Sequence, residues 1–455
     1  MIKDILLLCA AFILPAIAGY LTIATLDKDG MVSRIERAAL SFAVGAGLLS
    51  FYMFLIGMLG FAFSLAALLP FFLISGGIAV LLARNNRGIR PENKNINNFM
   101  ETKLSLPKLI INFVFLCLIA WRIFFAIFNA STYPPYFDDA VTTWDYKAKV
   151  IFSNKSLGKS FSTDFLGGGT GSGYPLNTSL FKVWTSMMVG KWDERYIHFY
   201  NFTIFICMLI LFFISLRQYA TTTISLTFSY ILTSIPLMAF HSYGGYADLT
   251  TGFYFFAGML MLARWIHTKA DCFLYIMVML VAVMAFTKNE GYLIFTPAIL
   301  ATFLYFLFVS GLSRKEKMKK VSILVVGIII LIGPWLITKG TYNIGIGSFP
   351  IEFHKEAFAE LLRVFFTEGS FNILWISAAL LIILNPKGAV ARLCLPYLLP
   401  TLLAFLATVA VFVFTVNFEW LWVRTTINRS LLILTPSIVF STALLVLNLN
   451  KGCVK

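Results

Sequence analysis

The chain has 455 residues, of which 59% are hydrophobic and only 13% are charged. A soluble protein of this length cannot bury so much apolar surface, so the composition excludes a soluble enzyme or binding module. The apolar runs are long and continuous, which excludes a transmembrane β-barrel built from alternating strands. The composition therefore predicts an all-α polytopic membrane protein.

Thirteen apolar segments are candidates for helices that cross a hydrocarbon core about 30 Å thick. They lie near residues 5–25, 38–59, 62–83, 109–130, 197–216, 222–240, 249–263, 271–287, 291–310, 321–338, 371–385, 393–415 and 429–448. We expect an N-terminal three-helix region with its loop (1–108), a main transmembrane domain (109–448) and a short tail (449–455). Two connecting segments, 131–196 and 339–370, are long, and long loops are where function is usually placed.

Lysine and arginine residues gather on one side of this arrangement. If the loop 84–108 is cytoplasmic, that side holds 21 of the 36 Lys and Arg residues and 7 of the 21 Asp and Glu residues. The other side then holds 15 and 14. The positive-inside rule places the N-terminus outside and the C-terminus in the cytoplasm. Topology explains the net charge of +15, so no nucleic-acid partner is expected.

The stretch 133–149 directly follows the apolar run 109–130 and combines acids, an aromatic ring and cations. Asp138 and Asp139 can supply a general base beside a reacting hydroxyl or amine, or ligands for a metal. Neighbouring residues of one helical turn point in different directions, so only one of them is expected to face a substrate. The alternative is that Asp138 is the N-cap of a short helix from 139 to 152. Both interpretations can hold at once.

Other polar residues also fall at the outer ends of the expected spans, where they can line one cavity. The candidate cations for holding a phosphate are Lys147, Lys288, Arg424 and Arg429. A phosphate needs fixed cations and donors, and arginine offers bidentate contacts. Snorkelling toward lipid head groups is the alternative for the lysines, and we favour it for Lys149. The aromatic and acidic candidates are Trp144, Tyr174, Asp248, Glu290 and Glu419, with helix capping as the alternative for Asp248.

Two further segments of the long loops have recognisable patterns. Apolar side chains recur at roughly helical spacing over 351–366, with charges between them. This predicts an amphipathic helix that lies on the outer membrane surface or packs on the external loop. The glycine-rich run 167–173 predicts a flexible stretch that can move as a lid before Tyr174. Cysteine and histidine spacing matches no metal site, so no metal ligand and no cofactor are assigned.

Taken in order, these motifs resemble those of integral-membrane glycosyltransferases of the C-type fold, in the branch of protein O-mannosyltransferases and the lipid A aminoarabinose transferase. The similar elements are Asp138-Asp139, Tyr174-Pro175-Leu176, Gly245-Tyr246-Ala247-Asp248, Lys288-Asn289-Glu290-Gly291, and Glu419-Trp420 with Arg424-Thr425 and Arg429. The resemblance implies a C-type fold in a bacterial inner membrane. It also implies a polyprenyl-phosphate-linked sugar as donor and transfer to a lipid, glycan or protein acceptor on the outer face.

The resemblance also distributes roles among the candidates. Asp139 would be the base that activates the acceptor, with Asp138 as the fallback, in a single in-line displacement at the sugar carbon. The four cations would hold the donor phosphate, whose leaving charge they stabilise. The aromatic and acidic residues would shape the sugar or acceptor site.

Two other classes stay open. A transporter or flippase of lipid-linked sugars would also be polytopic and basic inside. Such proteins place charges near mid-membrane and often contain internal repeats, whereas the middles of these spans are nearly free of charge. A lipid-linked-glycan polymerase or ligase is an enzyme too, on a different membrane scaffold.

Overall fold

The computed structural model describes residues 2–85, 105–133, 138–157, 173–344 and 350–452. Apart from one isolated β-bridge between Ile351 and Thr415, the regular structure of these residues is helical. The first half contains α1 (Ile2–Leu26), α2 (Arg34–Met58), α3 (Leu65–Asn85), α4 (Leu106–Thr132), η1 (Ala140–Asp145), α5 (Tyr146–Asn154), α6 (Asn177–Val189), α7 (Glu194–Leu216), α8 (Thr222–Ser234) and α9 (Pro236–His241). The second half contains α10 (Asp248–Thr268), α11 (Asp271–Ala285), η4 (Gly291–Phe295), α12 (Thr296–Phe308), α13 (Arg314–Thr341), α14 (Ala357–Phe366), η5 (Gly369–Phe371), α15 (Leu374–Leu384), α16 (Pro386–Ala389), α17 (Leu395–Phe414), η6 (Val416–Leu421) and α18 (Thr425–Gly452).

Each of the thirteen expected spans is occupied by helix, and within the described residues nine helical segments are long and apolar enough to cross a membrane. The nine are α1, α2, α4, α7, α10, η4 with α12, α13, α17 and α18. They confirm the prediction of an all-α polytopic membrane protein. Shorter apolar helices lie at Leu65–Ile78, Asp271–Ala285 and Leu374–Leu384. That all thirteen segments cross the membrane, and in a C-type fold, stays a prediction.

The expected span 222–240 is divided into two helices, α8 and α9. Pro236 lies at the start of α9, and Ile235 before it has an extended backbone. Proline has no N–H to continue the hydrogen-bond ladder, and it disfavours the helical conformation in the residue before it. Because of this break, α9 is a separate short helix that ends at His241, shortly before Gly244 and Gly245.

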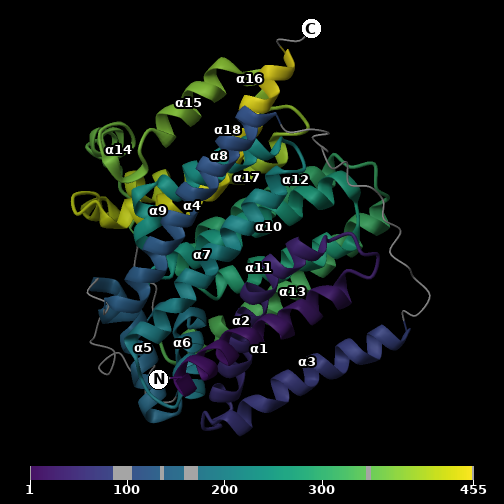
Figure 1. Cartoon of the computed structure of the whole chain (residues 1–455), viewed down its shortest axis with the longest axis vertical. Coiled ribbons are helices and arrows are strands. Elements are labelled where there is room, and N and C mark those ends of the chain that lie inside the picture. Colours follow the sequence, from purple (N-terminus) through teal and green to yellow (C-terminus); the bar gives the residue numbers. More distant parts are fainter. Residues whose placement is uncertain (1, 86–104, 134–137, 158–172, 345–349, 453–455) are drawn as a thin grey trace.

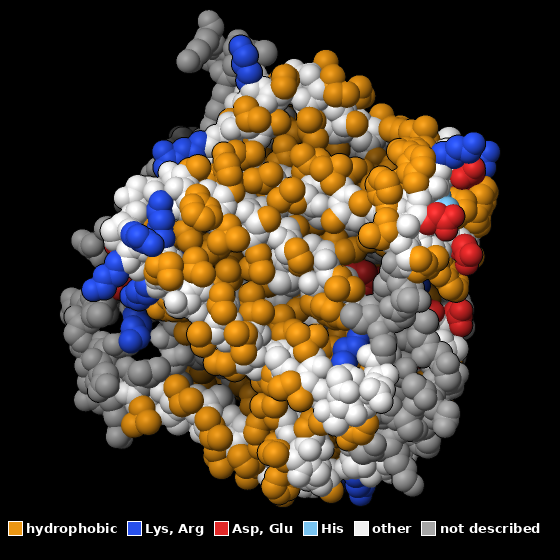
Figure 2. All heavy atoms as spheres, turned by 180° about the vertical axis from the view of Figure 1, so that it is seen from behind, with side chains coloured by type: hydrophobic (Ala, Val, Ile, Leu, Met, Phe, Trp, Pro, Cys, Tyr) orange, Lys and Arg blue, Asp and Glu red, His pale blue; other side chains and the backbone are white. Residues whose placement is uncertain are grey.

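The helices differ sharply in how much of their surface is buried. In Figure 1 the long helices run roughly parallel, with α14 and α15 at the upper left and α3 along the lower right. α2, α10 and α18 are buried nearly throughout, whereas few residues of α1, α4 and α13 are fully buried. Figure 2 shows a broad apolar face with Lys and Arg along its left edge and Asp and Glu at its right edge. Such a continuous apolar surface is what a lipid bilayer covers.

The predicted amphipathic segment is confirmed as a helix over part of its length. α14 begins at Ala357 and is preceded by non-helical residues. Its buried residues include Leu361 and Val364, and it packs against α15, α17 and η6. Phe358 and Leu362 are exposed on its other side. One face of α14 therefore packs against the protein, and the other face exposes apolar side chains.

α1 and α2 pack closely through small residues. A Cβ atom added to Gly45 would overlap the carbonyl of Pro15, and one added to Gly19 would overlap the carbonyl of Ser41. Glycine at such crossings lets two helical backbones approach, as in small-residue motifs of membrane helices.

Replacing Gly45 by leucine is therefore expected to separate α1 from α2 and to destabilise the protein by about 2 kcal/mol or more, because overpacking forces the backbone to move. Thermal unfolding of the detergent-purified variant measures the effect. Gly76→Leu is the matched control, because a Cβ on Gly76 meets no atom within 4 Å. Equal melting temperatures for the two variants would contradict the close helix contact.

Candidate functional site

Segments that are distant in the sequence meet at one end of the helix bundle. Asp139 forms an ion pair with Arg429, although 290 residues separate them. Lys288 lies 2.7 Å from a carboxylate oxygen of Asp248 and 2.7 Å from one of Glu290. We call Asp139, Asp248, Lys288, Glu290 and Arg429 the charged cluster. All five motifs that carry the resemblance thus contribute at least one residue to this place, counting Tyr174, which is described next.

Tyr174 is near enough to both ion-paired groups for their charges to act on it. The negative charge of Glu290, followed by burial, raises the pKa of Tyr174 well above its usual value, while Lys288 and Arg429 act in the opposite direction. The ring of Tyr174 contacts that of Trp144, with centroids 5.1 Å apart. Two aromatic faces therefore lie next to the charges, an arrangement suited to a ligand that has both polar groups and an apolar face.

Lys288 and Asp248 form the buried part of the cluster. The exposed fractions of the two residues are 4% and 0%. Burial alone would lower the pKa of Lys288, but Asp248 and Glu290 outweigh it and raise that pKa, so the amine is charged. One oxygen each of Asp248 and Glu290 is buried without a hydrogen-bond partner among the described residues. Buried acceptors are normally satisfied, so each of these oxygens can still accept a hydrogen bond.

Asp139 and Asp138 have different surroundings. Asp139 is half-buried and held by Arg429, whose guanidinium lies 5.3 Å from the centre of the Tyr246 ring. Asp138 is exposed, and no side-chain hydrogen bond or ion pair to a described residue holds its carboxylate. Both residues are helical, and the carbonyl of Asp138 accepts a 2.8 Å hydrogen bond from the hydroxyl of Thr142. Of the adjacent acids, Asp139 is the one that faces the cluster.

Two short π-helices adjoin the charged motifs. η1 follows Asp139, and η4 follows Glu290. π-Helices are rare, and they frequently occur at functional sites because the extra residue changes which side chains share a face. Gly291 begins η4 at a point where a Cβ would overlap the carbonyl of Met284. This close approach explains the glycine of the Lys-Asn-Glu-Gly element.

Lys147 is buried, with 1% of its surface exposed. Its Nζ donates to the carbonyl oxygen of Tyr174 at 3.0 Å and lies 6.0 Å from the centre of the Trp144 ring. Burial, with a smaller contribution from the charge of Lys339, lowers the pKa of Lys147 to about 7. Unlike the other candidate cations, it contacts no carboxylate within the described residues.

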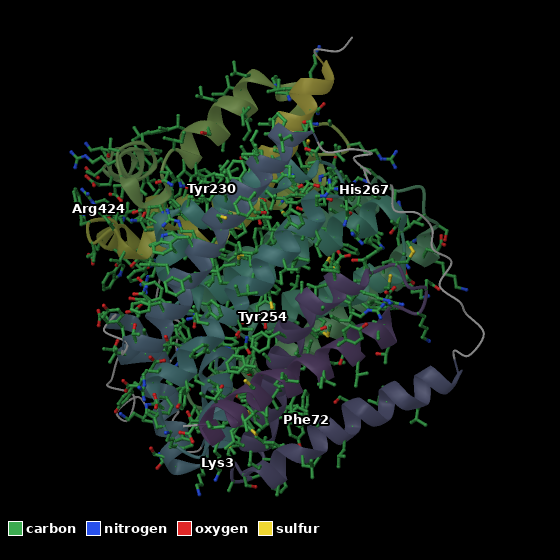
Figure 3. All side chains as sticks on the ribbon, viewed as in Figure 1. Lys3, Phe72, Tyr230, Tyr254, His267 and Arg424 are labelled. Atoms are coloured by element: carbon green, nitrogen blue, oxygen red, sulfur yellow. The ribbon has the colours of Figure 1, made fainter. Side chains whose placement is uncertain are left out.

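Arg424 and Glu419 are not joined to the charged cluster by any contact among the described residues. Arg424 lies in the turn before α18, at the left edge of the molecule in Figure 3. Its guanidinium is 3.2 Å from Glu368 and 3.8 Å from Glu360, so its charge is already balanced. Glu419 is exposed in η6. Their roles in a phosphate or sugar site stay predictions from the resemblance.

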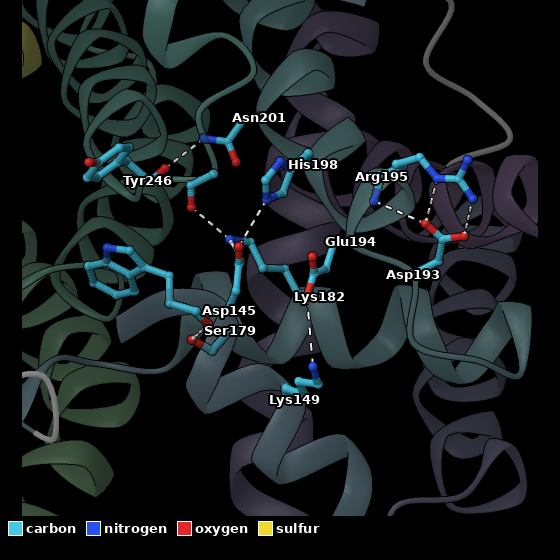
Figure 4. Close-up of polar contacts among 12 residues, drawn as sticks. Asp145, Lys149, Ser179, Lys182, Asp193, Glu194, Arg195, His198, Asn201 and Tyr246 are labelled. Atoms are coloured by element: carbon cyan, nitrogen blue, oxygen red, sulfur yellow. Dashed lines mark hydrogen bonds and ion pairs between the residues drawn. The ribbon is translucent and has the colours of Figure 1, made fainter. Parts of the chain in front are cut away.

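A buried triad behind the cluster escaped the sequence analysis. The Lys182 Nζ lies 2.5 Å from one oxygen of Asp145, and the His198 Nε2 lies 3.0 Å from the other (Figure 4). Burial would raise the pKa of Asp145, but Lys182 and His198 lower it. We call Asp145, Lys182 and His198 the buried triad. The one available signal was a lysine in the middle of a helix that is otherwise without charge, 177–189.

The buried triad holds the backbone that carries the site. Lys182 also donates to the carbonyl of Gly245 at 2.7 Å. Nearby, Asn201 donates to the carbonyl of Tyr246 at 2.6 Å, and the Ser179 hydroxyl donates to that of Trp144 at 3.0 Å (Figure 4). Gly245 has a φ of +77°, a conformation that favours glycine. These contacts fix the positions of Tyr246 and Trp144.

His241, like the buried triad, was assigned no role from the sequence. It is buried against the ring of Tyr246, with ring centres 4.9 Å apart, and its Nδ1 has no partner among the described residues. Burial lowers the pKa of His241 to about 4; Asp248 opposes this shift, and Arg429 and Lys288 add to it. The imidazole is therefore neutral at physiological pH and can donate or accept one hydrogen bond beside the cluster.

Neither a metal centre nor a described surface hollow coincides with the cluster. Within the described ranges, no group of three or more His, Cys, Asp or Glu side chains is placed to hold a metal ion. A hollow of about 120 Å³ lies on the face of η1 and α5 that carries Val141 and Lys149, next to Trp192. Its lining includes Asp145 but none of the charged cluster.

The arrangement offers three chemical abilities at one end of the bundle. Asp139 is a half-buried carboxylate that can take a proton, and its ion pair with Arg429 orients it. Asp248 and Glu290 each present an acceptor oxygen that lacks a partner among the described residues, and Lys147 presents a buried amine that contacts no described carboxylate. Comparisons of the chain with protein-family models, with curated proteins and with solved structures found no match.

Proposed function

We propose that this protein is a glycosyltransferase of the C-type fold. In this proposal it moves a sugar from a polyprenyl-phosphate donor to a lipid, glycan or protein acceptor at the outer face of a bacterial inner membrane. The observation that carries the proposal is the half-buried Asp139 beside the buried charges of Lys288 and Asp248, at one end of a bundle of membrane helices. The resemblance of the ordered motifs supports the reaction class.

The proposed reaction is one displacement at the anomeric carbon of the sugar, with inversion. The carboxylate of Asp139 takes the proton of the acceptor hydroxyl or amine as its oxygen or nitrogen bonds to that carbon. The bond from the carbon to the phosphate oxygen breaks, and the electron pair leaves with the polyprenyl phosphate. Cations beside the leaving oxygen stabilise the charge that develops on it.

The other residues of the site have binding roles in this proposal. The free oxygens of Asp248 and Glu290 accept hydrogen bonds from sugar hydroxyls. The rings of Trp144 and Tyr174 pack against the apolar face of the sugar. Nucleotide sugars are absent outside the cell, so a lipid carrier is the donor that this orientation requires.

Transfer by the purified protein in lipid vesicles tests the proposal. Radiolabelled polyprenyl-phosphate sugars are supplied with an extract of membrane lipids and glycans, and we expect label in a new product. Nucleotide sugars serve as the control and are expected to give none. Movement of the donor between leaflets without any new product would contradict the proposal and favour a flippase. A product that grows by several sugar units would favour a polymerase instead.

A further inference from the structure

Most cations at this end of the bundle are neutralised by carboxylates. Arg429 is paired with Asp139, and Lys288 with Asp248 and Glu290. Lys182 is likewise paired in the buried triad, and Arg424 contacts two glutamates. A cation whose charge is already balanced gains less from binding a further anion, because part of its field is cancelled.

Among the described residues, Lys147 and Lys339 are two buried exceptions, and we call them the lysine pair. Their exposed fractions are 1% and 6%, and neither contacts a carboxylate within the described residues. They come from different elements, since Lys147 is in α5 and Lys339 is in the last turn of α13. Lys339 belongs to none of the motifs that carry the resemblance.

The two amines donate to consecutive carbonyl groups of one stretch of backbone. Lys147 donates to the carbonyl oxygen of Tyr174 at 3.0 Å, and Lys339 donates to that of Gly173 at 3.3 Å. Gly173 and Tyr174 are consecutive, so the two Nζ atoms are held by adjacent peptide groups. Lys339 also lies 3.3 Å from the hydroxyl of Tyr292.

Aromatic rings surround the pair. The Nζ of Lys147 is 6.0 Å from the ring centre of Trp144. The Nζ of Lys339 is 5.8 Å from those of Tyr292 and Trp335. Aromatic faces attract cations, but they carry no net charge and keep water away. The charge of Lys339 acts on Lys147, so two cationic side chains interact in surroundings of low polarity.

Such an arrangement is unfavourable unless an anion completes it. Buried charges are normally paired, because removing them from water has a large energetic cost. An ammonium group has three donors, and Lys147 uses only one of them on a described partner, so two remain for a ligand. The lowered pKa of Lys147 is the expected sign of a buried amine that lacks its counter-ion.

We infer that Lys147 and Lys339 together form a binding site for a phosphoryl oxyanion, held between the aromatic rings of Trp144, Tyr292 and Trp335. A phosphate monoester or diester supplies several acceptor oxygens and the negative charge that the two amines lack. The identification of this anion with the phosphate of the polyprenyl donor rests on the proposed function. In this identification the lysine pair, rather than Lys288, Arg424 and Arg429, makes the principal contacts with the phosphate.

Binding measurements on the full chain in nanodiscs test this site. Short-chain polyprenyl phosphate is titrated by calorimetry, with inorganic phosphate and the uncharged polyprenol as separate arms. We expect binding of the lipid phosphate to weaken at least tenfold in Lys147→Met and in Lys339→Met. Lys149→Met is the matched control and should bind as the wild type does, because Lys149 is exposed and lies 3.9 Å from Glu194.

The different ligands show whether the site binds a lipid phosphate or free phosphate. They also test the lysine-pair site separately from the proposed glycosyltransferase activity. Inorganic phosphate that binds as tightly as the lipid phosphate, and depends on both lysines, would support the anion site but overturn a lipid donor. Unchanged lipid-phosphate affinity in both variants would overturn the lysine pair, whether or not wild-type protein transfers sugar. Lysine-dependent binding without transfer would support the pair and contradict the glycosyltransferase. A buried amine that lacks a described carboxylate partner destabilises the fold, so replacing it by methionine should not lower the melting temperature. Melting temperatures at or above that of the wild type will therefore show that both variants fold.

Discussion

Replacing Asp139 by asparagine is expected to lower the rate of sugar transfer by about 10²- to 10⁴-fold, the usual contribution of a general base. The amide has the same shape as the carboxylate but cannot take the proton of the acceptor. Donor binding should persist, because the lysine pair and the carboxylates of Asp248 and Glu290 are unchanged. Single-turnover transfer of radiolabelled sugar, measured beside donor affinity, separates the two effects.

Asp138→Asn is the closest control for this experiment. Its carboxylate is exposed and has no described partner, so we expect transfer within about threefold of the wild type, in keeping with a surface change. Asp193→Asn, in the N-cap of α7, is a second control remote from the cluster. Loss of transfer in Asp138→Asn with normal transfer in Asp139→Asn would make Asp138 the base. Normal transfer in both variants would refute general-base catalysis by this acidic pair.

Replacing Lys182 by methionine is expected to destabilise the protein by about 3–5 kcal/mol, the usual effect of breaking a buried ion pair. Lys182 and Asp145 are 0% and 4% exposed, so the change leaves the carboxylate buried with only His198 to support it. The contact from Lys182 to the carbonyl of Gly245 is lost as well. Thermal unfolding in detergent at neutral pH measures the effect.

A second substitution distinguishes loss of charge balance from loss of packing. The double variant Lys182→Met with Asp145→Asn removes both charges and should recover much of the lost stability, because neither variant side chain needs a counter-ion. Lys191→Met breaks an exposed pair with Asp4 and is expected to change the melting temperature little, because solvent screens such a pair. A loss in Lys182→Met as small as that in Lys191→Met would contradict a structural role for the buried triad.

The pH dependence of stability has a defined sign for the buried triad. Lys182 and His198 lower the pKa of Asp145 below its usual value despite burial. The folded state therefore binds the proton of Asp145 less readily than the unfolded chain does. This stabilisation is fully present above the usual aspartate pKa and is lost as the pH falls through the lowered one.

Local sequence was sufficient for the class of protein and for where its helices lie. Each of the thirteen expected spans contains helix, and the amphipathic segment contains α14, because apolar run length and periodicity are properties of a few neighbouring residues. The motifs also predicted that Asp139, Asp248 and Lys288 would lie close together. The number of membrane crossings, the orientation and the chemical activity were predicted as well and stay predictions.

Only the tertiary structure decided which charges neutralise one another. Arg424 and Arg429 are five residues apart, yet Arg424 contacts glutamates of the 339–370 segment while Arg429 contacts Asp139. Sequence alone likewise gave no reason to join Lys182 to Asp145, or Lys339 to Lys147. Hydropathy is set by each residue and its neighbours, whereas an ion pair depends on how helix ends meet across hundreds of residues. The composition therefore determined a membrane protein, and the packing of its helices determined which of the described amines lie beside a carboxylate and which do not.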